Sequence, residues 1–370
     1  MVFRRAVLAA ILMSAVVIET NAVAQHLIPD EPTCRSCSIR SRVVTQIGDV
    51  DGPGAIPGLP MAFTNDASGR YWSVFRGATM IFNPDGRFLR PAGKRGQGPG
   101  EFTFVRVLTP LPGDSMLLLD IGGKITIMGP DLSPARYITM RVPSDWFSAT
   151  VIKWPGTLLV NGLLGTPDKV GWPLHTFGMS GDAVRILKSF GDNRGELRPD
   201  MSDRLRQHVL LALDGTIWAG DRFNYRLTQW DSNGNLKRTT ERRPAWFREE
   251  SSGLDGGPNT PPPPQITGMH FDRSGRVWVY AIVAKPTWRQ AWKDVPRIPA
   301  GSETTEGPAF EELFQSRIEI IDPRTARVVT TATYKDPIIA ALPNGLAAAY
   351  TVDASGVPRF SIISLTLVGS

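Results

Sequence analysis

One pair of residues, Cys34 and Cys37, has a spacing known from redox and metal chemistry, and the 370-residue chain has no other cysteine. A Cys-x-x-Cys pair can form a local disulfide, exchange disulfides, or supply half of a four-cysteine zinc site. Such a zinc site needs two more cysteines, and haem attachment needs a histidine where the chain has Ser38. Because a thioredoxin-like βαβ context is missing, we expect a disulfide, with a redox-active pair as the alternative.

A second candidate for chemistry is the glycine-rich segment 93–101, whose composition suggests a nucleotide-binding loop. It contains Pro99 and no helical pattern follows it, so we interpret it as a connecting turn. Arg95 and Glu101 remain its polar groups that could reach a ligand. The chain also lacks a Gly-x-Ser-x-Gly nucleophile motif and a phosphate loop that continues into Lys-Ser or Lys-Thr. Nucleophilic catalysis and nucleotide binding are therefore not indicated.

The elements that must position these residues are short strands separated by tight turns. Apolar runs are brief, rich in Val, Ile, Leu, Trp and Tyr, and bounded by Gly, Pro, Asp and Asn, which predicts an all-β chain. Helical periodicity is almost absent. A glycine turn followed by an apolar strand recurs along the sequence at Gly69, Gly113, Gly156, Gly215, Gly275 and Gly345.

A second turn, rich in Pro, Asp, Asn and Gly, follows the glycine turn in five of these six units. Two turns per unit imply four strands, and repeated four-stranded units around an axis form a β-propeller. We therefore predict six blades. Seven blades remain the alternative, because the interval between Gly275 and Gly345 is much longer than the earlier intervals.

The sixth unit has no second turn and no fourth strand of its own. Segment 42–48 near the N-terminus has the composition of that strand. It is followed by Gly-Pro-Gly at 52–54, as the outer strand of the first unit is followed by Gly-Pro-Gly at 98–100. We predict that this N-terminal strand completes the last blade and closes the ring, which removes a free sheet edge.

Residues 1–24 have the pattern of a signal peptide. Arg4 and Arg5 precede an apolar run that is shorter than the roughly 20 residues of a membrane span. A small-x-small cleavage motif ends at Ala24, and no cysteine stands at the cleavage site to carry a lipid anchor. We expect a segment with the cysteines over 25–40 and one propeller domain over 41–370, in the periplasm or outside the cell, with no transmembrane span.

The net charge of +6 does not come from a run of basic residues. Acidic residues and prolines interrupt the densest basic stretches, and no nucleic-acid motif is present. We interpret the basic residues as a solvated surface and expect a monomer that binds no nucleic acid.

Three parts of one unit carry a resemblance to a known repeat. Residues 214–221, 225–227 and 230–234 resemble an NHL-type repeat, and 96–102 is similar to the glycine-rich lead into such repeats in secreted bacterial six-bladed propellers of the TolB-like superfamily. The resemblance covers nearly all of the chain after residue 24, most clearly in the first, fourth and fifth units. It implies the fold and leaves function open, because that family includes both binding scaffolds and enzymes.

In the topology that the resemblance implies, the loops between blades and the loops between second and third strands share one face. The two longest, 241–265 and 281–317, lie there, and long loops on a rigid scaffold often carry function. We expect a protein, peptide or carbohydrate to bind this face, unless the tryptophans only pin the loops to the scaffold. The candidate contacts are Arg243, Trp246, Trp288, Arg289 and Trp292.

Similar propeller lyases hold zinc with three histidines near the axis. Here His175, His208 and His270 are available, since His26 lies at the expected cleavage site. We place His208 and His270 on innermost strands of adjacent blades, but no metal-binding spacing joins the three. A calcium site at 49–52 lacks the remaining ligands of a known loop.

The sequence therefore favours a binding module without a cofactor over an enzyme. The alternative is a metal-dependent enzyme of the lactonase or lyase type, with zinc or calcium in the central channel. A purely structural component of the cell envelope is a third interpretation.

Overall fold

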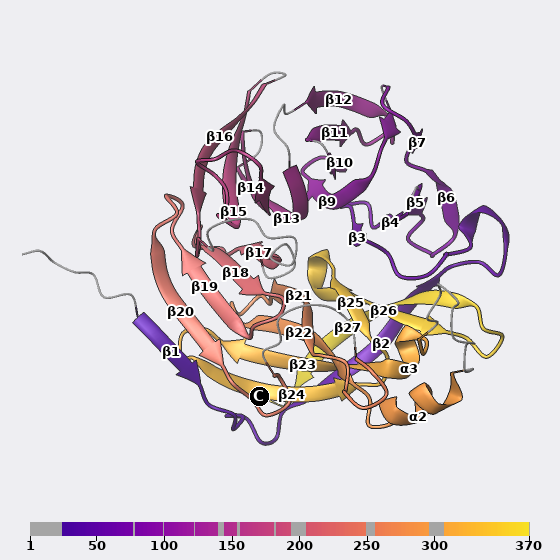
Figure 1. Ribbon diagram of the computed structural model, residues 1–370, viewed down its shortest axis with the longest axis vertical. Helices are drawn as coiled ribbons and strands as arrows, with labels where there is room; N and C mark the ends of the chain where they lie inside the picture. The colour runs from indigo at the N-terminus through magenta and orange to yellow at the C-terminus, as the bar shows by residue number, and fades with distance from the viewer. Residues whose placement is uncertain are drawn as a thin grey trace, which may run out of the picture.

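The computed structural model describes residues 24–76, 78–98, 100–121, 123–139, 144–153, 156–180, 183–193, 205–248, 256–295 and 307–369. In this part of the chain, six antiparallel sheets of four strands surround a central axis, and one sheet gains a fifth strand (Figure 1). The chain is therefore an all-β, six-bladed propeller, as predicted, and the seven-bladed alternative is wrong.

Each blade runs from an innermost strand at the axis to an outermost strand at the rim. The first three blades are β3 (Ala62–Asn65), β4 (Tyr71–Phe75), β5 (Ala78–Phe82) and β6 (Phe88–Pro91); β9 (Val105–Leu111), β10 (Ser115–Asp120), β11 (Lys124–Met128) and β12 (Pro134–Thr139); and β13 (Ser144–Lys153), β14 (Thr157–Leu164), β15 (Leu174–Ser180) and β16 (Ala183–Phe190).

The fourth and fifth blades follow the same order, and the sixth ends on an N-terminal strand. They are β17 (Gln207–Leu211), β18 (Ile217–Asp221), β19 (Arg226–Trp230) and β20 (Leu236–Arg242); β21 (Gln265–Phe271), β22 (Val277–Ala284), β23 (Phe314–Asp322) and β24 (Arg327–Tyr334); and β25 (Ile338–Ala341), β26 (Leu346–Val352), β27 (Pro358–Val368) and β2 (Ser38–Ile47).

One carboxylate stabilises the recurring turn by accepting several hydrogen bonds. In the first blade, Asp66 accepts hydrogen bonds from the Arg70 backbone N–H at 2.9 Å, from Arg70 Nε at 2.7 Å and from Trp72 Nε1 at 3.0 Å. Gly69 takes the positive φ of +80° that this turn requires. Asp272 repeats the arrangement in the fifth blade. The turn therefore fixes both the hairpin and a buried tryptophan.

Apolar faces of neighbouring blades pack against one another and form the core. Leu117 and Leu119 alternate along β10, so they share one side of their sheet and contact Leu158 and Val160 of the next blade. Similar clusters fill the space between the other blades. The innermost strands are thereby held rigidly around the axis.

The N-terminal strand closes the ring as predicted. β2 pairs antiparallel with β27, from Ser38 opposite Val368 to Ile47 opposite Phe360. It starts before residue 41, so the propeller includes part of the segment expected to precede it. The sixth blade thus combines a strand from near the N-terminus with three strands from the C-terminal part of the chain.

A second N-terminal strand, β1 (Ala24–Ile28), was not predicted. It pairs in parallel with β20 and becomes the fifth strand of blade four (Figure 1). The chain then crosses blade five, where the backbone N–H groups of Thr33 and Cys34 bond the carbonyls of Val328 and Val329 at 2.8 and 3.0 Å. Residues 24–37, which we name the N-terminal strap, therefore span the rims of blades four and five and lead into β2 of blade six.

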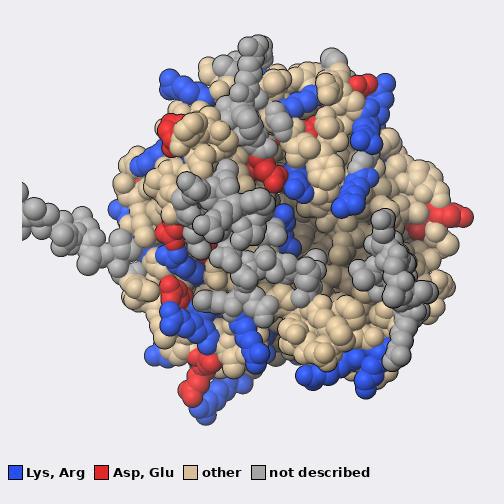
Figure 2. Space-filling view, in the orientation of Figure 1, with Lys and Arg blue, Asp and Glu red and all other residues tan. Residues whose placement is uncertain are grey.

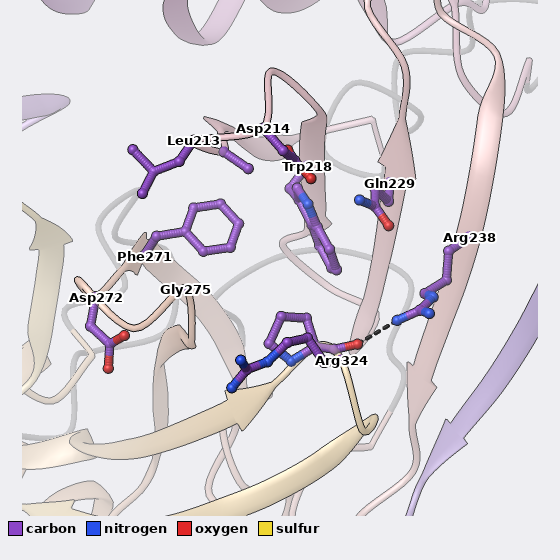
Figure 3. A pocket seen from close by; sticks show the side chains of 11 residues that line it. Leu213, Asp214, Trp218, Gln229, Arg238, Phe271, Asp272, Gly275 and Arg324 are labelled. Atoms are coloured by element: carbon purple, nitrogen blue, oxygen red, sulfur yellow. Dashed lines mark hydrogen bonds between the residues drawn. The ribbon is translucent and has the colours of Figure 1, made fainter.

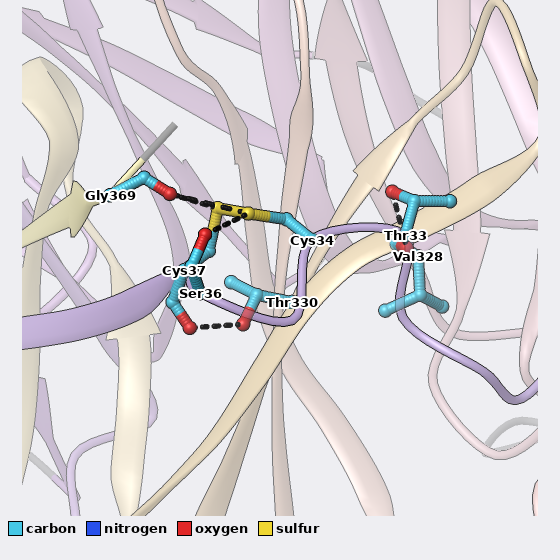
Figure 4. Close-up of a disulfide and its surroundings, with 7 residues drawn as sticks. All are labelled: Thr33, Cys34, Ser36, Cys37, Val328, Thr330 and Gly369. Carbon is cyan, nitrogen blue, oxygen red and sulfur yellow. Dashed lines mark hydrogen bonds between the residues drawn. A yellow bond between two sulfur atoms is a disulfide. The ribbon is translucent and has the colours of Figure 1, made fainter.

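The predicted disulfide between Cys34 and Cys37 is present at the end of the strap (Figure 4). It lies beside Gly369, and Thr330 Oγ1 donates a hydrogen bond of 3.2 Å to the Cys37 carbonyl. The disulfide therefore shapes the chain where the strap meets blades five and six.

Two short helices, α2 (Trp288–Asp294) and α3 (Phe310–Leu313), lie in the connection from β22 to β23. Within the described ranges, no helix is long and apolar enough to cross a membrane.

Candidate functional site

The two ends of the propeller differ in their connections. One end carries the links between blades and the links between second and third strands, and we name it the long-loop face. The other end carries the remaining tight turns, and we name it the short-turn face. Figure 2 looks onto the long-loop face, where a hollow lies near the centre and Lys and Arg side chains gather beside it. This is the face on which we expected the working surface.

A cavity of about 350 Å³ lies on the axis, because all six innermost strands contribute to its wall. Much of that wall is apolar and includes Phe63, Leu108, Val209, Met269 and Leu342. The rigid ring therefore encloses a preformed channel large enough for part of a ligand.

Three arginines line a recess of about 70 Å³ at the long-loop end of this channel: Arg106, Arg206 and Arg222. Arg206 directly precedes β17 and Arg222 directly follows β18, which places both at this end of blade four. The recess shares Phe147 and His208 with the wall of the channel, so the two spaces adjoin. We name the recess the channel mouth.

A neighbouring group positions each guanidinium at the channel mouth, and guanidinium groups stay charged at any ordinary pH. Arg106 Nε lies 3.3 Å from Asp145 Oδ1, Arg206 lies over the Phe147 ring at 5.0 Å, and Arg222 Nε donates to Gln265 Oε1 at 3.0 Å.

Carboxylates lie near the channel mouth but do not line it among the described residues. Asp145 pairs with Arg106, and Asp221 accepts a hydrogen bond from Gln207 Nε2 at 3.1 Å. Among the described residues, the recess itself is therefore lined by three cationic groups and no carboxylate, a lining that suits an anion.

The structure confirms that His208 and His270 lie on innermost strands of adjacent blades, β17 and β21. His208 Nε2 is 3.0 Å from the Ile266 carbonyl, and His270 Nδ1 is 3.2 Å from the Tyr280 hydroxyl. Burial lowers the pKa of each to about 4, so both are neutral at pH 7.

His175 lies elsewhere, buried inside blade three on β15. Its ring nitrogens lie 2.8 Å from Ser189 Oγ and 3.2 Å from the Gly162 carbonyl. The structure therefore does not bring these three candidate metal ligands together. Across the described ranges, no group of three or more His, Cys, Asp or Glu side chains could hold a metal ion, and this includes the segment 49–52.

Trp288 and Trp292 belong to α2 and mainly fix their own loop. Trp288 is only 6% exposed and packs with Ile282, Leu313 and Phe314, while Trp292 is half-buried against the same cluster. Arg289 is exposed, with its guanidinium 4.6 Å from the Trp288 ring centre. Trp288 therefore fits the alternative interpretation, in which the tryptophan fixes its own loop to the propeller.

The remaining candidates of loop 241–265 occupy two different settings. Arg243 is exposed and pairs with Glu241 Oε2 at 3.0 Å. Trp246 is half-buried and lines a separate cavity between this loop and blade five. Neither residue lines the channel mouth.

Arg95 and Glu101 lie in the link between blades one and two, in the short parallel pair of β7 (Lys94–Arg95) and β8 (Glu101–Phe102). Glu101 accepts a hydrogen bond of 2.9 Å from the Gly98 N–H, which lowers the pKa of its carboxyl, and lies 3.4 Å from Lys94 Nζ. Arg95 is exposed beside a small recess. Glu101 therefore holds this turn together, and neither residue lines the channel mouth.

The short-turn face has a cleft of similar size to the channel, about 350 Å³, between blades four and five (Figure 3). Trp218 and Phe271 form its apolar wall, with ring centres 5.9 Å apart, and Leu213 is 95% exposed at its edge. Polar groups around it are engaged within the protein: Asp214 binds Thr216, Arg324 binds Asp322, and Arg238 donates to the Pro323 carbonyl. The cleft therefore offers mainly apolar surface.

No sequence pattern used above singled out the three arginines of the channel mouth. A usable signal was present, because Arg106 and His208 occupy the same position relative to their turn glycines, Gly113 and Gly215. Aligning the units on these glycines places both residues on innermost strands near the channel end. Arg206 and Arg222 lie in irregular backbone, where alignment of the repeat is weaker.

Comparison with known proteins supports the fold. No family model and no curated protein matches the chain. A Bacteroides fragilis protein proposed to be exported matches with a TM-score of 0.55 at 10% identity, over 94% of this chain and 100% of its own. Virginiamycin B lyase from Staphylococcus aureus matches with a TM-score of 0.43 at 10% identity, over 90% of this chain and 100% of its own.

At such identities, structural likeness identifies the fold alone. The NHL character of the repeats remains a prediction.

Proposed function

We propose that this chain is an exported propeller that binds an anionic ligand, carried by a peptide, protein or carbohydrate, at the channel mouth of its long-loop face. The observation that carries the proposal is the convergence of Arg106, Arg206 and Arg222 on one recess that adjoins the axial channel. Guanidinium groups recognise carboxylate, sulfate and phosphate groups through paired hydrogen bonds.

The channel and its mouth offer complementary chemistry. The arginines can hold an acidic group at the mouth, while Phe63, Leu108 and Met269 can cover an apolar part inside the channel. This combination favours a ligand with an acidic end and an apolar body, such as a peptide with a free carboxyl terminus.

The lactonase- or lyase-type alternative depends on donors that converge on a metal. The described histidines do not converge, and those at the channel use ring nitrogens in contacts within the protein. The geometry therefore supports binding better than metal-dependent chemistry.

A calorimetric titration with acidic and amidated peptides tests the proposal. Arg106→Met, Arg206→Met and Arg222→Met should each weaken binding of the acidic peptide by roughly tenfold or more, because each removes hydrogen bonds to a charged group. Arg243→Met is the matched control, since Arg243 lies on the same loop side but outside the channel mouth. Equal binding by all four variants would contradict the proposal.

Export is supported by the signal pattern of residues 1–24 and by the disulfide, which suits an oxidising compartment. The similar Bacteroides protein, itself proposed to be exported, agrees with this. Mass spectrometry of the chain from the periplasm or medium should find an N-terminus at Gln25. An intact N-terminus in the cytoplasmic fraction would contradict export.

A further inference from the structure

We infer that a second cavity on the long-loop face, the one lined by Trp246 and Arg317, is a binding site for a carboxylate. The cavity has a volume of about 320 Å³ and lies between the loop after β20 and the side of blade five that faces blade four. It shares no lining residue with the channel mouth. The inference therefore stands apart from the function proposed above.

Two hydrogen-bond donors at this cavity lack acceptors. Trp246 Nε1 and Arg317 Nε are both buried, and neither makes a hydrogen bond in the described part of the protein. The Arg317 guanidinium lies 5.0 Å from the Trp246 ring centre, so the two side chains stack together. Buried donors are costly to leave unpaired, and both belong to side chains that line the cavity, so a ligand whose acceptors draw these side chains toward it would satisfy them.

The nearest carboxylate is already engaged by other groups. Glu319 receives hydrogen bonds from Arg242 at 2.6 and 2.9 Å and from the Tyr225 hydroxyl at 2.8 Å. Its distance of 3.6 Å from Arg317 Nε is too long for a hydrogen bond. Arg317 therefore keeps donor capacity that Glu319 does not use.

The charge of the lining points to an anion. Among the described residues, the cavity is lined by two guanidinium groups, Arg248 and Arg317, and by no carboxylate. A carboxylate ligand would place two acceptor oxygens opposite these donors and balance their charge.

The rest of the cavity wall limits the size of the group that carries the carboxylate. Residues 261–264, all proline, form one side, and Val283 and Ala284 form part of the other. A volume of about 320 Å³ suits one sugar ring or a short peptide end. The shared chemistry is a carboxylate, carried by either a uronic acid or a peptide terminus.

Calorimetric titration of the full mature chain tests this inference with four probes. They are D-galacturonate, D-galactose, and an N-acetyl dipeptide with a free or an amidated carboxyl terminus. At least one acid should bind, and its neutral partner should bind at least tenfold more weakly. The pair that shows this difference identifies the source of the carboxylate.

Two substitutions locate the binding. Trp246→Phe removes the indole N–H and keeps an aromatic ring, while Arg317→Met removes the guanidinium and leaves Glu319 paired with Arg242. Each should weaken binding of the acid by roughly tenfold to a hundredfold. Arg289→Met is the matched control, because Arg289 also stacks on a tryptophan but lies outside the cavity. Thermal melting confirms that the variants are folded.

The inference is overturned if none of the four probes binds, if neutral and acidic probes bind alike, or if Trp246→Phe and Arg317→Met bind like the parent chain. It is also overturned if Arg106→Met abolishes acid binding while those two variants retain it. That last result would support the channel mouth instead, so the two proposals fail separately.

Discussion

The two faces of this propeller use the same residue types for different purposes. On the short-turn face, Asp66 and Asp272 each hold a hairpin, an arginine and a tryptophan in one hydrogen-bonded unit. On the long-loop face, Arg106, Arg206 and Arg222 surround a recess next to the axial channel. Charged groups thus stabilise turns at one end of the molecule and line a cavity at the other, where we propose that they bind a ligand.

Among single substitutions at neutral pH, the largest loss of stability should follow from removing a carboxylate of the short-turn face. Asp66 is 1% exposed, and Asp66→Ala removes the acceptor for Arg70 and for the buried Trp72 indole. We expect a loss of about 3–5 kcal/mol in the free energy of unfolding, as for other buried pairs with one partner removed. Urea denaturation measures this loss.

Ligand binding at the long-loop face should be unchanged in Asp66→Ala below its melting temperature. The exposed turn residue Asp131 supplies the control, because its hydrogen bonds within the described part of the chain go to Ser133, and Asp131→Ala should cost less than about 1 kcal/mol. Similar costs for both variants would contradict the assignment of a special role to Asp66.

The free energy of unfolding should depend on the interior histidines and on the turn carboxylates in different pH ranges. Burial lowers the pKa of His175, His208 and His270 to about 4, below the unfolded value near 6.5. The unfolded chain therefore binds more protons between these values, and stability should fall as pH drops from about 6.5 to 4, by up to about 1.4 kcal/mol per pH unit for each histidine.

Turn carboxylates should respond only at lower pH. The hydrogen bond from Thr216 lowers the pKa of Asp214, so its contribution is present above the unfolded pKa near 3.9 and is lost as pH falls through the folded pKa. His175→Gln should flatten the dependence above pH 4 and leave the lower part intact. An unchanged slope between pH 6.5 and 4 would show that His175 does not titrate as described.

Opening the disulfide should have a smaller effect. The bond closes a very short loop, and chain entropy assigns such a loop roughly 2 kcal/mol. We expect Cys34→Ser/Cys37→Ser to lower the free energy of unfolding by about 1–2 kcal/mol, because backbone hydrogen bonds still hold the N-terminal strap on blade five. Loss of folding at 25 °C would mean that the disulfide, rather than strand pairing, secures the strap.

The smallest effect should come from the apolar edge of the short-turn cleft. Leu213 is 95% exposed, so Leu213→Ser should change the free energy of unfolding by less than about 0.5 kcal/mol. Binding of acidic ligands should also be unchanged. A clear loss of binding in a titration would move the working surface to the short-turn face.

The fold was predictable because its signals are local and repeated. Turn glycines with positive φ, such as Gly69 and Gly275, must recur wherever the same hairpin recurs, and they give the blade count directly. Closure by β2 followed from a missing strand in the last unit. β1 could not be found in this way, because its parallel pairing with β20 depends on a sheet edge that is distant in the sequence.

The candidate site was less predictable. The long loops of the sequence pointed to one face as the working surface, and Trp288 was chosen there, which the fold uses as a buried anchor. Conversely, Arg206 and Arg222 belong to no recognisable sequence motif. They flank β17 and β18, and only the ring of six blades brings them next to Arg106. Whether an aromatic residue is exposed or buried depends on tertiary packing, which single-sequence patterns do not encode.

The most direct test of the difference between the two faces is a crystal structure of the mature chain with an acidic peptide that binds it. We expect the carboxylate of the peptide to lie within hydrogen-bond distance of Arg106, Arg206 or Arg222, with the peptide entering the axial channel. A peptide bound instead in the cleft beside Leu213 and Trp218, with the channel mouth empty, would contradict the account.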